Sequence, residues 1–487
     1  MGDPDEMATL EYIPTIPKFL EFIKKQYSDY PAISDKVTTY TYEELVSRVA
    51  KRVTFINSLG LEKGSNIAVL AKNDLDAMEL FLAIPAAGHV LIMLPNALND
   101  KALAGISMKF DLAGMFVGKE FTEVTANLPC KTWSSTSIGE TESTFADVEK
   151  DTTAAIFFTG GTTGAPKGAV HSHGSIMRGS FNGVFGPGSI LHKRYIAMLP
   201  LSHIFGAIMG YMAKLYTGSL TYTCTDMRAG IGDIPVVRPT TLVLVPGLVE
   251  IILNIAKLKG RAFLGDLELI MCGAAPVPPR QMEECRELGI TLCAGYGLTE
   301  CANLTSGNCD TDKKPESMGH IYPEQQVKVV DGELWIKGDN VMKEYYKDPE
   351  HTAEVLEDGW FKTGDLVEFD DNDWIYITGR IKNLIILPNG ENVSPEEIEE
   401  LFYKQSLVKD CLVQEMEMNG NTVIGVEIIP YMPELDGASE EEIQNRLQET
   451  VNEVNKELPP FKRVLKMKVR TEDFKRSGAM KILRNQV

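Results

Sequence analysis

The sequence predicts an α/β protein with a large N-terminal domain of mixed, mostly parallel sheets flanked by helices, and a small α+β C-terminal domain. Its 487 residues are too many for a single hydrophobic core. Strand and helix signals alternate over the first two thirds of the chain, as they do in parallel sheets covered by helices. After about Asp331, short strand patterns typical of a smaller antiparallel element replace that alternation.

The elements of the first part follow from local signals. Thr41 can cap a helix, because Glu44 three residues later completes a capping box. A second helix is predicted over residues 74–83. The apolar stretch at residues 80–94 contains proline and glycine and is shorter than a membrane span, so it indicates a buried helix, a turn and a buried strand. Strands are predicted at residues 66–70, 155–158 and 241–245.

The elements of the last part are shorter. Residues 332–336 and 374–377 have the pattern of antiparallel strands, and residues 384–393 that of a hairpin with its turn at Asn389–Gly390. A helix is predicted over residues 395–403, with Ser394 as its cap and a proline in its first turn. We place the domain boundary beside Arg380–Lys382, which gives domains of residues 1–381 and 382–487.

Composition excludes several classes of function. The formal charge of -20 argues against a general nucleic-acid binder or a binder of anionic membranes, since both partners favour basic surfaces. No two of the eight cysteines have the Cys-x-x-Cys spacing of a zinc or redox site, a pattern typical of reduced thiols. The first six residues lack a secretion signal. We therefore expect a cytoplasmic protein without stable membrane insertion.

The most informative motif is a loop at residues 159–168, directly after the strand that ends at Phe158. It contains four glycines, three threonines and Lys167. Such a loop can turn its backbone N–H groups towards phosphate oxygens, and Lys167 adds a positive charge. A flexible surface turn is the alternative interpretation. The loop does not match the Walker A motif, because Pro166 precedes Lys167 and Gly168 follows it, so a P-loop ATPase or kinase is disfavoured.

This loop resembles the signature of the adenylate-forming, AMP-binding superfamily, which contains acyl- and aryl-CoA synthetases. With Gly160 where many members have serine, it is most similar to the long-chain fatty-acid CoA ligases. Further family motifs follow in the expected order along essentially the whole chain. The resemblance implies that the small C-terminal domain is mobile and carries a catalytic lysine.

His203, in a Pro-Leu-Ser-His segment, matches the histidine that lies beside the substrate carboxylate in the family. Amino-acid-activating relatives have an aspartate there, so an amino-acid substrate is disfavoured. The Gly273–Pro276 turn resembles the turn that packs against adenine and borders the acyl pocket. Candidate pocket residues have an apolar character that suits an acyl chain or an aromatic ring. The acyl pocket is expected to include His203, Phe205, Tyr211, Val245, Gly247 and Gly273.

The segment at residues 295–300 resembles the motif in which an aromatic ring stacks on adenine, a threonine bonds a phosphate and a glutamate binds Mg²⁺. Glu300, together with Thr159, is therefore expected at the metal, which prefers oxygen ligands. Asp365 matches the aspartate that accepts hydrogen bonds from both ribose hydroxyls. The resemblance assigns ATP or AMP binding to Thr159, Gly160, Gly161, Thr162, Thr163, Gly164, Lys167, Gly273, Ala274, Ala275, Gly295, Tyr296, Gly297, Thr299, Glu300, Asp365, Arg380 and Lys481.

The remaining roles come from the same resemblance. Lys382 stands at the family's hinge position, and Gly390 belongs to the hairpin that faces the thiol tunnel. The Ser-Gly-Ala-Met-Lys segment resembles the terminal catalytic-lysine motif but has two residues between glycine and lysine, so the role is assigned to Lys481, with Lys475 as the fallback. The expected catalytic residues are Lys481, His203, Glu300 and Arg380.

The resemblance implies an ATP-dependent acid–thiol ligase, an AMP-forming acyl-CoA synthetase, that uses ATP, Mg²⁺ and coenzyme A. It would convert a carboxylic acid, expected to be a fatty acid, to acyl-AMP and pyrophosphate, and then to acyl-CoA and AMP. Two alternatives remain open. The chain could load an acyl-carrier protein, or it could be a non-catalytic nucleotide-binding protein. The sequence leaves the acid, its length and the oligomeric state undetermined.

Overall fold

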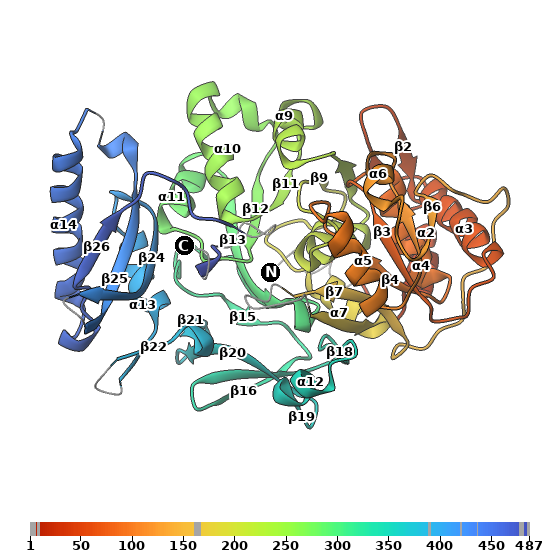
Figure 1. The fold of residues 1–487 in the computed structure, drawn as a ribbon. Helices are drawn as coiled ribbons and strands as arrows, with labels where there is room; N and C mark the ends of the chain where they lie inside the picture. The colour runs from red at the N-terminus through yellow and green to blue at the C-terminus, as the bar shows by residue number, and fades with distance from the viewer. Residues whose placement is uncertain are drawn as a thin grey trace.

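The computed structural model describes residue 6 and residues 10–159, 167–387, 391–418, 421–435, 437–476 and 482–484. The fold class predicted from the sequence is confirmed. Sheets and helices of the large N-terminal region occupy the right and centre of Figure 1, and a smaller C-terminal unit, drawn in blue, lies at the left. The predicted boundary between residues 381 and 382 stays a prediction.

The largest sheet has seven strands, and four of its six neighbouring pairs are parallel, as the alternation of elements predicts. Only β8 and β18 run antiparallel to their neighbours. Its order is β18 (Glu344–Tyr345), β8 (Gly168–Ser172), β7 (Thr153–Phe158), β4 (Val90–Met93), β3 (Asn66–Leu70), β5 (Leu112–Val117) and β6 (Lys131–Ser134). Helices of this region are α2 (Ile16–Tyr27), α3 (Tyr42–Ser58), α4 (Leu75–Ala86), α5 (Asp100–Lys109), α6 (Thr122–Thr125) and α7 (His173–Asn182).

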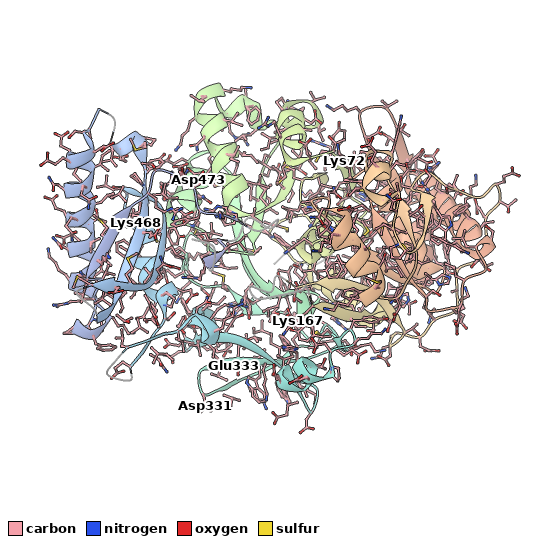
Figure 2. All side chains as sticks on the ribbon, viewed as in Figure 1. Lys72, Lys167, Asp331, Glu333, Lys468 and Asp473 are labelled. Atoms are coloured by element: carbon pink, nitrogen blue, oxygen red, sulfur yellow. The ribbon has the colours of Figure 1, made fainter. Side chains whose placement is uncertain are left out.

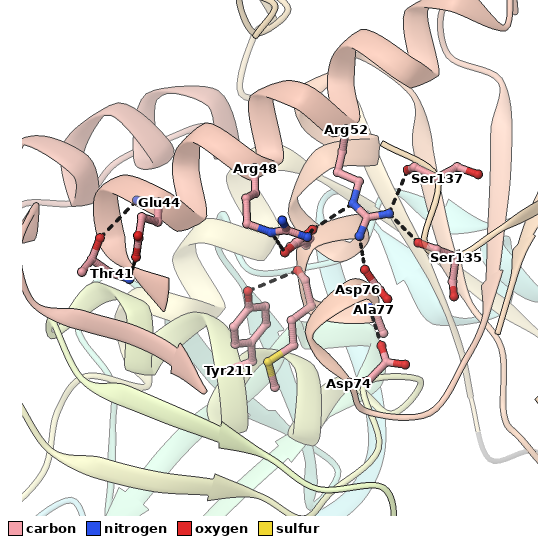
Figure 3. Close-up of polar contacts among 12 residues, drawn as sticks. Thr41, Glu44, Arg48, Arg52, Asp74, Asp76, Ala77, Ser135, Ser137 and Tyr211 are labelled. Atoms are coloured by element: carbon pink, nitrogen blue, oxygen red, sulfur yellow. Dashed lines mark hydrogen bonds and ion pairs between the residues drawn. The ribbon is translucent and has the colours of Figure 1, made fainter. Parts of the chain in front are cut away.

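The local signals that predicted two of these helices, α3 and α4, are confirmed. Thr41 and Glu44 form the predicted capping box at the start of α3. Asp74 caps α4, which ends at Ala86 and is followed by the buried strand β4. Figure 3 shows polar contacts that join these two helices, among them the one from Arg52 of α3 to Asp76 of α4. Arg52 also donates to Glu79 of α4 at 2.9 Å, and the side chains of Arg52 and Glu79 are fully buried.

A second sheet lies in the green centre of Figure 1. Its first three strands are parallel and its last two are antiparallel. Its order is β11 (Thr241–Leu244), β12 (Leu269–Gly273), β13 (Thr291–Leu298), β14 (Asn303–Asn308) and β15 (His320–Ile321). A third sheet contains β2 (Thr39–Thr41), β1 (Pro31–Ser34), β10 (Leu220–Thr223) and β9 (Arg194–Ala197). Helices in this part are α8 (Ala213–Tyr216), α9 (Met227–Val237), α10 (Pro246–Lys259) and α11 (Pro279–Glu287), and a π-helix, η2, spans Phe205–Met212.

The antiparallel element predicted after Asp331 is also present. It contains β16 (Gln326–Val330), β17 (Glu333–Lys337), β20 (Trp360–Phe369), β19 (Leu356–Glu357) and β21 (Ile375–Arg380), with helix α12 (Pro349–Val355). The C-terminal unit contains β22 (Ile385–Ile386), β23 (Asn392–Val393), α13 (Pro395–Tyr403), β24 (Val408–Met418), β25 (Asn421–Pro430), α14 (Glu440–Glu457) and β26 (Lys466–Val469). Strands β22 and β23 form the predicted hairpin, whose turn lies outside the described residues.

One detail of the prediction differs. Ser394 occupies the N-cap position of α13, but its side chain forms no capping bond to the helix backbone. Its hydroxyl donates instead to Glu396 at 3.1 Å.

All eight cysteines lie in described segments and are free thiols. Among the helices in the part of the chain that is described, none is long and apolar enough to cross a membrane.

Candidate active site

The glycine motifs of β12 and β13 meet at the carboxyl ends of these parallel strands, where α/β folds place ligands. Gly273 pairs directly with Gly295. A Cβ atom on Gly273 would lie 3.1 Å from the carbonyl oxygen of Gly295 and 3.3 Å from the ring of Phe205. Ala274, which follows, has a φ of 71°. The strand ends and the ring are therefore packed so closely that a side chain at Gly273 would displace one of them.

A second close approach fixes the next turn. A Cβ atom on Gly297 would lie 1.5 Å from the carbonyl oxygen of Asn303, so only glycine fits there. This turn positions Thr299 and Glu300 in the 3₁₀ turn Thr299–Cys301. The backbone N–H of Met342 donates to the carbonyl of Glu300 at 2.7 Å.

Glu300 is linked to the predicted phosphate loop through Tyr345. The Tyr345 hydroxyl donates to Oε1 of Glu300 at 2.7 Å. The ammonium of Lys167 lies 5.2 Å from the centroid of the Tyr345 ring, within cation–π range. Burial, and next the carboxylate of Glu300, raises the pKa of Tyr345, so its hydroxyl remains a donor. In Figure 2, Lys167 lies beside the segment that carries β18.

The predicted ribose-binding residues form a second cluster. Asp365 on β20 is 2% exposed and pairs in register with Arg380 on β21. The Arg380 Nε donates to Oδ1 of Asp365, and its Nη2 donates to Oδ2 at 3.2 Å. Burial opposes the charge of Arg380, but the Asp365 carboxylate more than offsets it and raises the pKa of Arg380.

Tyr296 joins this cluster from β13. Its hydroxyl donates to Oδ2 of Asp365 at 2.7 Å, and burial raises the pKa of Tyr296. The ring is 7% exposed and packs among the core residues of the antiparallel sheet. Its expected stacking on adenine stays a prediction.

His203 lies in the turn before η2, where its backbone N–H donates to the carbonyl of Pro200 at 3.1 Å. Its Nδ1 accepts a hydrogen bond of 3.2 Å from the backbone N–H of Phe205. In a neutral ring the proton is then on Nε2, which makes that nitrogen a donor. The local backbone thus selects the tautomer that could donate to a carboxylate.

A cavity lies beside this turn and the ends of β12 and β13. Its walls include Phe185, Phe205, Met209, Met271, Gly295 and Tyr322. Of the predicted acyl-pocket residues, Phe205 lines this cavity, and its role in acyl binding stays a prediction. The five other predicted acyl-pocket residues line neither this cavity nor a second cavity that Met271 also lines. His203 and Gly273 contact Phe205, whereas Tyr211, Val245 and Gly247 are held elsewhere.

Each of these last three residues has a physical reason for its position. Tyr211 is fully buried in the N-terminal core, because its hydroxyl donates to the carbonyl of Met78 at 3.2 Å. Val245 is 2% exposed, packs in the core of the second sheet and precedes α10. Gly247 belongs to the first turn of α10.

Several expected site residues lie outside the described residues: Gly160, Gly161, Thr162, Thr163, Gly164, Gly390 and Lys481. The two ends of the loop are described, and the backbone N–H of Thr159 donates to the carbonyl of Lys167 at 2.9 Å. Ala275 lies in the turn after β12, and Lys382 in a 3₁₀ turn directly after β21.

Two residues at the site were not found by sequence reasoning. Tyr345 connects Lys167 to Glu300, as described above. His171, on β8, bonds the carbonyl of Thr299 through Nε2 at 2.9 Å and Ser175 through Nδ1 at 3.1 Å. Burial lowers the pKa of His171 to about 4. No local motif marks either residue, because the bond of each to the Thr299–Cys301 turn spans more than 40 positions in the chain.

The donor set fits Mg²⁺ held mainly by a nucleotide. Among the residues that the structure describes, no group of three or more His, Cys, Asp or Glu side chains could hold a metal ion. Mg²⁺ commonly uses one or two carboxylates together with substrate phosphates. A single carboxylate at Glu300, close to the loop that Lys167 ends, matches that requirement.

Comparisons with known proteins agree with this geometry. The model of the AMP-binding enzyme family matches residues 20–346, and that of the AMP-binding enzyme C-terminal domain matches residues 382–487. A feruloyl-CoA synthase from an Amycolatopsis species is 28% identical over 77% of this chain and 80% of its own length. A 2-succinylbenzoate–CoA ligase from Listeria monocytogenes is 27% identical over 77% and 80%, respectively.

Solved structures share the fold along almost the whole chain. An o-succinylbenzoate CoA synthetase from Bacillus subtilis, in complex with its acyl-adenylate, has a TM-score of 0.81 at 22% identity and covers 96% of this chain and 97% of its own. An anthranilate CoA ligase in complex with anthranoyl-AMP has a TM-score of 0.85 at 18% identity, covering 99% and 98%. The same Bacillus synthetase has also been solved with ATP and a magnesium ion.

The chain therefore belongs to the AMP-binding enzyme family. Within it, the chain is an enzyme of the AMP-forming CoA ligase class, for which ATP, Mg²⁺ and CoA are the cofactors. The narrower resemblance to long-chain fatty-acid ligases is not supported, because the relatives found include ligases named for feruloyl, 2-succinylbenzoyl and indoleacetyl groups.

Proposed function

We propose that this protein is an ATP-dependent acid–thiol ligase that forms an acyl-adenylate and then transfers the acyl group to CoA. The observation that carries the proposal is the meeting of two clusters, Glu300–Tyr345–Lys167 and Tyr296–Asp365–Arg380, around the ends of β12 and β13. One cluster offers groups for phosphates and a metal, and the other offers a carboxylate for a diol.

In the first half-reaction, a carboxylate oxygen of the acid attacks the α-phosphorus of ATP, and the bond to the pyrophosphate oxygen breaks. Negative charge collects on phosphate oxygens, so catalysis consists mainly of positioning and electrostatic stabilisation. Mg²⁺, held by Glu300 with Thr159 nearby, would supply positive charge beside the phosphates. Lys167 and the threonine-rich loop would hold the departing pyrophosphate.

The other side chains bind and orient the reactants. Asp365 would accept a hydrogen bond from the ribose, and Arg380, held by Asp365, would remain charged towards the phosphate side. His203 would donate from Nε2 to the acid, because Phe205 occupies its Nδ1. Lys481 is proposed to bridge the carboxylate and the α-phosphate. Its loss is expected to lower adenylation by about 10²–10³-fold, as for the loss of one oriented oxyanion donor.

In the second half-reaction, a thiolate attacks the carbonyl carbon of the adenylate and AMP leaves. We propose residues 382–487 as the mobile domain, with Lys382 as its hinge and the hairpin at Gly390 facing the thiol. The match of the C-terminal family model, which begins at residue 382, supports this division.

The acid is proposed to be compact and aromatic rather than a long-chain fatty acid. Phe185, Phe205 and Tyr322 are the aromatic members of the cavity wall, and the rings of Phe185 and Tyr322 are stacked with centroids 5.8 Å apart. Flat walls of this kind favour a flat ring by stacking. The aromatic acids in the names of several relatives support the same class.

A pyrophosphate-release assay tests the function. Purified full-length protein is incubated with ATP, Mg²⁺ and a panel of cinnamates, benzoates and saturated fatty acids of increasing length, with and without CoA. We expect release with aromatic acids and a CoA thioester when CoA is present. Adenylation without any CoA thioester would indicate a carrier-protein acceptor, and no release with any acid would refute the proposal.

A matched pair of variants links the activity to the site. Glu300→Gln removes the proposed metal-binding charge, whereas Glu368→Gln removes a charge from the exposed face of β20. We expect Glu300→Gln to require much more Mg²⁺ and to lose roughly 10²-fold or more in rate. Glu368→Gln is expected to behave like the unmodified protein.

A further inference from the structure

Behind the proposed acid cavity lies a buried lysine that has no counter-ion among the residues the structure describes. Lys214, on α8, is 2% exposed. Its Nζ lies 3.6 Å from Sδ of Met271 and 4.4 Å from the centroid of the Tyr195 ring. Within the described residues, no carboxylate forms an ion pair with it. A buried ammonium without an anion is unfavourable, and burial accordingly lowers the pKa of Lys214 to about 7.

Lys214 lines a cavity whose wall suits an anion. Besides Lys214, the polar members of the wall are Lys193 and the hydroxyl residues Ser189, Tyr195, Thr217 and Thr241. None of the residues that line it is Asp or Glu, although the Ser189 hydroxyl donates to the carboxylate of Glu6 at 2.8 Å. Lys193 is only partly buried and has Glu268 at 3.8 Å. The buried cation without a partner is therefore Lys214.

This cavity and the proposed acid cavity are separated by methionine. Met271 lines both of them. Gly186, in the wall of the Lys214 cavity, lies against Cε of Met271, because a Cβ atom there would be 3.1 Å away. A Cβ atom on Gly183 would likewise lie 2.9 Å from Sδ of Met209. Methionine side chains rotate easily, so a ligand in one cavity can displace them and reach the other.

The residues that line the two cavities show which cavity is nearer to the proposed position of the reacting carboxyl group. The acid cavity begins at Phe205 and Gly295, next to the turn of His203, where the reacting carboxyl group is proposed to lie. Met271 lines the same cavity two residues before Gly273 on β12, away from the carboxyl end of the strand, and Lys214 lies against its sulfur. A ligand that extends past Met271 therefore brings its remote end to the ammonium.

We propose that Lys214 is a specificity-determining residue that binds a second carboxylate, at the end of the acid substrate remote from the carboxyl group that is adenylated. The preferred substrate is then a dicarboxylic acid. This inference rests on the proposed ligase function. The ligand supplies the anion that the protein does not, and the buried pair forms only in the complex, which gives selectivity over acids without the second charge.

The test compares matched acids on the wild-type protein. Each pair shares one skeleton, such as 3-phenylpropanoate with 3-(4-carboxyphenyl)propanoate, and heptanoate with octanedioate. Pyrophosphate release gives kcat/KM for each acid. We expect the wild-type protein to favour the better-fitting dicarboxylate by roughly 10–150-fold, the range of one hydrogen bond to a charged group. This comparison does not depend on the folding of any variant.

Variants assign the preference to the residue. Lys214→Met keeps the length of the side chain without its charge, and we expect it to lose the preference while its kcat/KM for monocarboxylates changes less than about threefold. Lys101→Met, at an exposed position of α5, is the matched control and is expected to keep the preference.

The outcomes separate the two proposals. If none of the acids supports pyrophosphate release, the ligase function itself is refuted. Activity with monocarboxylates but no dicarboxylate preference in the wild-type protein would overturn the role of Lys214 and leave the ligase function standing. A preference that persists in a folded Lys214→Met protein would overturn it as well.

Discussion

Replacement of Asp365 by asparagine tests the nucleotide site most sharply. A carboxylate offers about four acceptor positions. Three side-chain hydrogen bonds already reach Asp365: one from Tyr296 and two from Arg380. In this arrangement the carboxylate can accept about one more bond, so we expect it to bind one ribose hydroxyl. A hydrogen bond to a charged group contributes about 1.5–3 kcal/mol, which corresponds to roughly 10–150-fold in kcat/KM.

The assay compares ATP with 2′-deoxy-ATP and 3′-deoxy-ATP by pyrophosphate release. The wild-type protein should discriminate by that factor against one of the two analogues, and Asp365→Asn should discriminate much less. The change in discrimination isolates the contact, because a general loss of activity affects all three nucleotides equally. Glu368→Gln, on the same strand, serves as the control. Equal discrimination in the wild-type protein and in Asp365→Asn would refute a ribose contact at Asp365.

Three further predictions concern stability, measured by chemical or thermal unfolding. Burial lowers the pKa of His171 from 6.5 to about 4. Between pH 6.5 and pH 4 the folded state therefore binds fewer protons than the unfolded chain, and the free energy of unfolding decreases as the pH falls through this range. His171→Gln should remove up to roughly 3 kcal/mol of this pH dependence, and an unchanged profile would contradict its burial as a neutral ring. Arg52→Met should destabilise by up to about 3–5 kcal/mol, because Asp76 loses its ion pair and the buried Glu79 keeps Arg48 but loses Arg52. Arg52→Met/Glu79→Met should recover part of this loss, and additive losses would exclude coupling between Arg52 and Glu79. Gly297→Ala should destabilise the protein by disrupting the β13–β14 pair, since the new Cβ atom would meet the carbonyl oxygen of Asn303. The control Gly105→Ala, in α5, should be neutral or stabilising. Equal effects of the two substitutions would exclude the close approach of Gly297 to Asn303.

Most of the fold was predictable, because strong local signals coincide with the observed elements. The capping box of Thr41 and Glu44 marks the start of α3, and the buried strand at residues 66–70 is β3. The predicted strand over residues 155–158 lies within β7. These signals depend on residues a few positions apart, so neighbouring residues in the chain carry them without tertiary information.

The pocket was predictable only in part, because helical residues share apolar character whichever way they face. Phe205 and Tyr211 lie on the same π-helix, yet Phe205 lines the cavity proposed for the acid and Tyr211 packs towards α4. Composition cannot separate two such residues, and the irregular helix removes the usual periodicity of 3.6 residues. Lys214 is a related case, since an isolated lysine after an apolar segment gives no sign that it is buried.

The contacts of the site explain how a chain with a net charge of -20 can bind an anion such as ATP. Its cations are held close to anionic or aromatic groups: Arg380 by Asp365, and Lys167 by the ring of Tyr345, which also bonds Glu300. Binding therefore has to exchange these internal contacts for contacts with phosphate, rather than fill a site of uncompensated positive charge. Such an exchange favours ligands that satisfy both members of each contact, a diol or metal for the carboxylate and a phosphate for the cation. A nucleotide with its metal ion meets both requirements, whereas a simple phosphate would leave Asp365 and Glu300 beside a like charge.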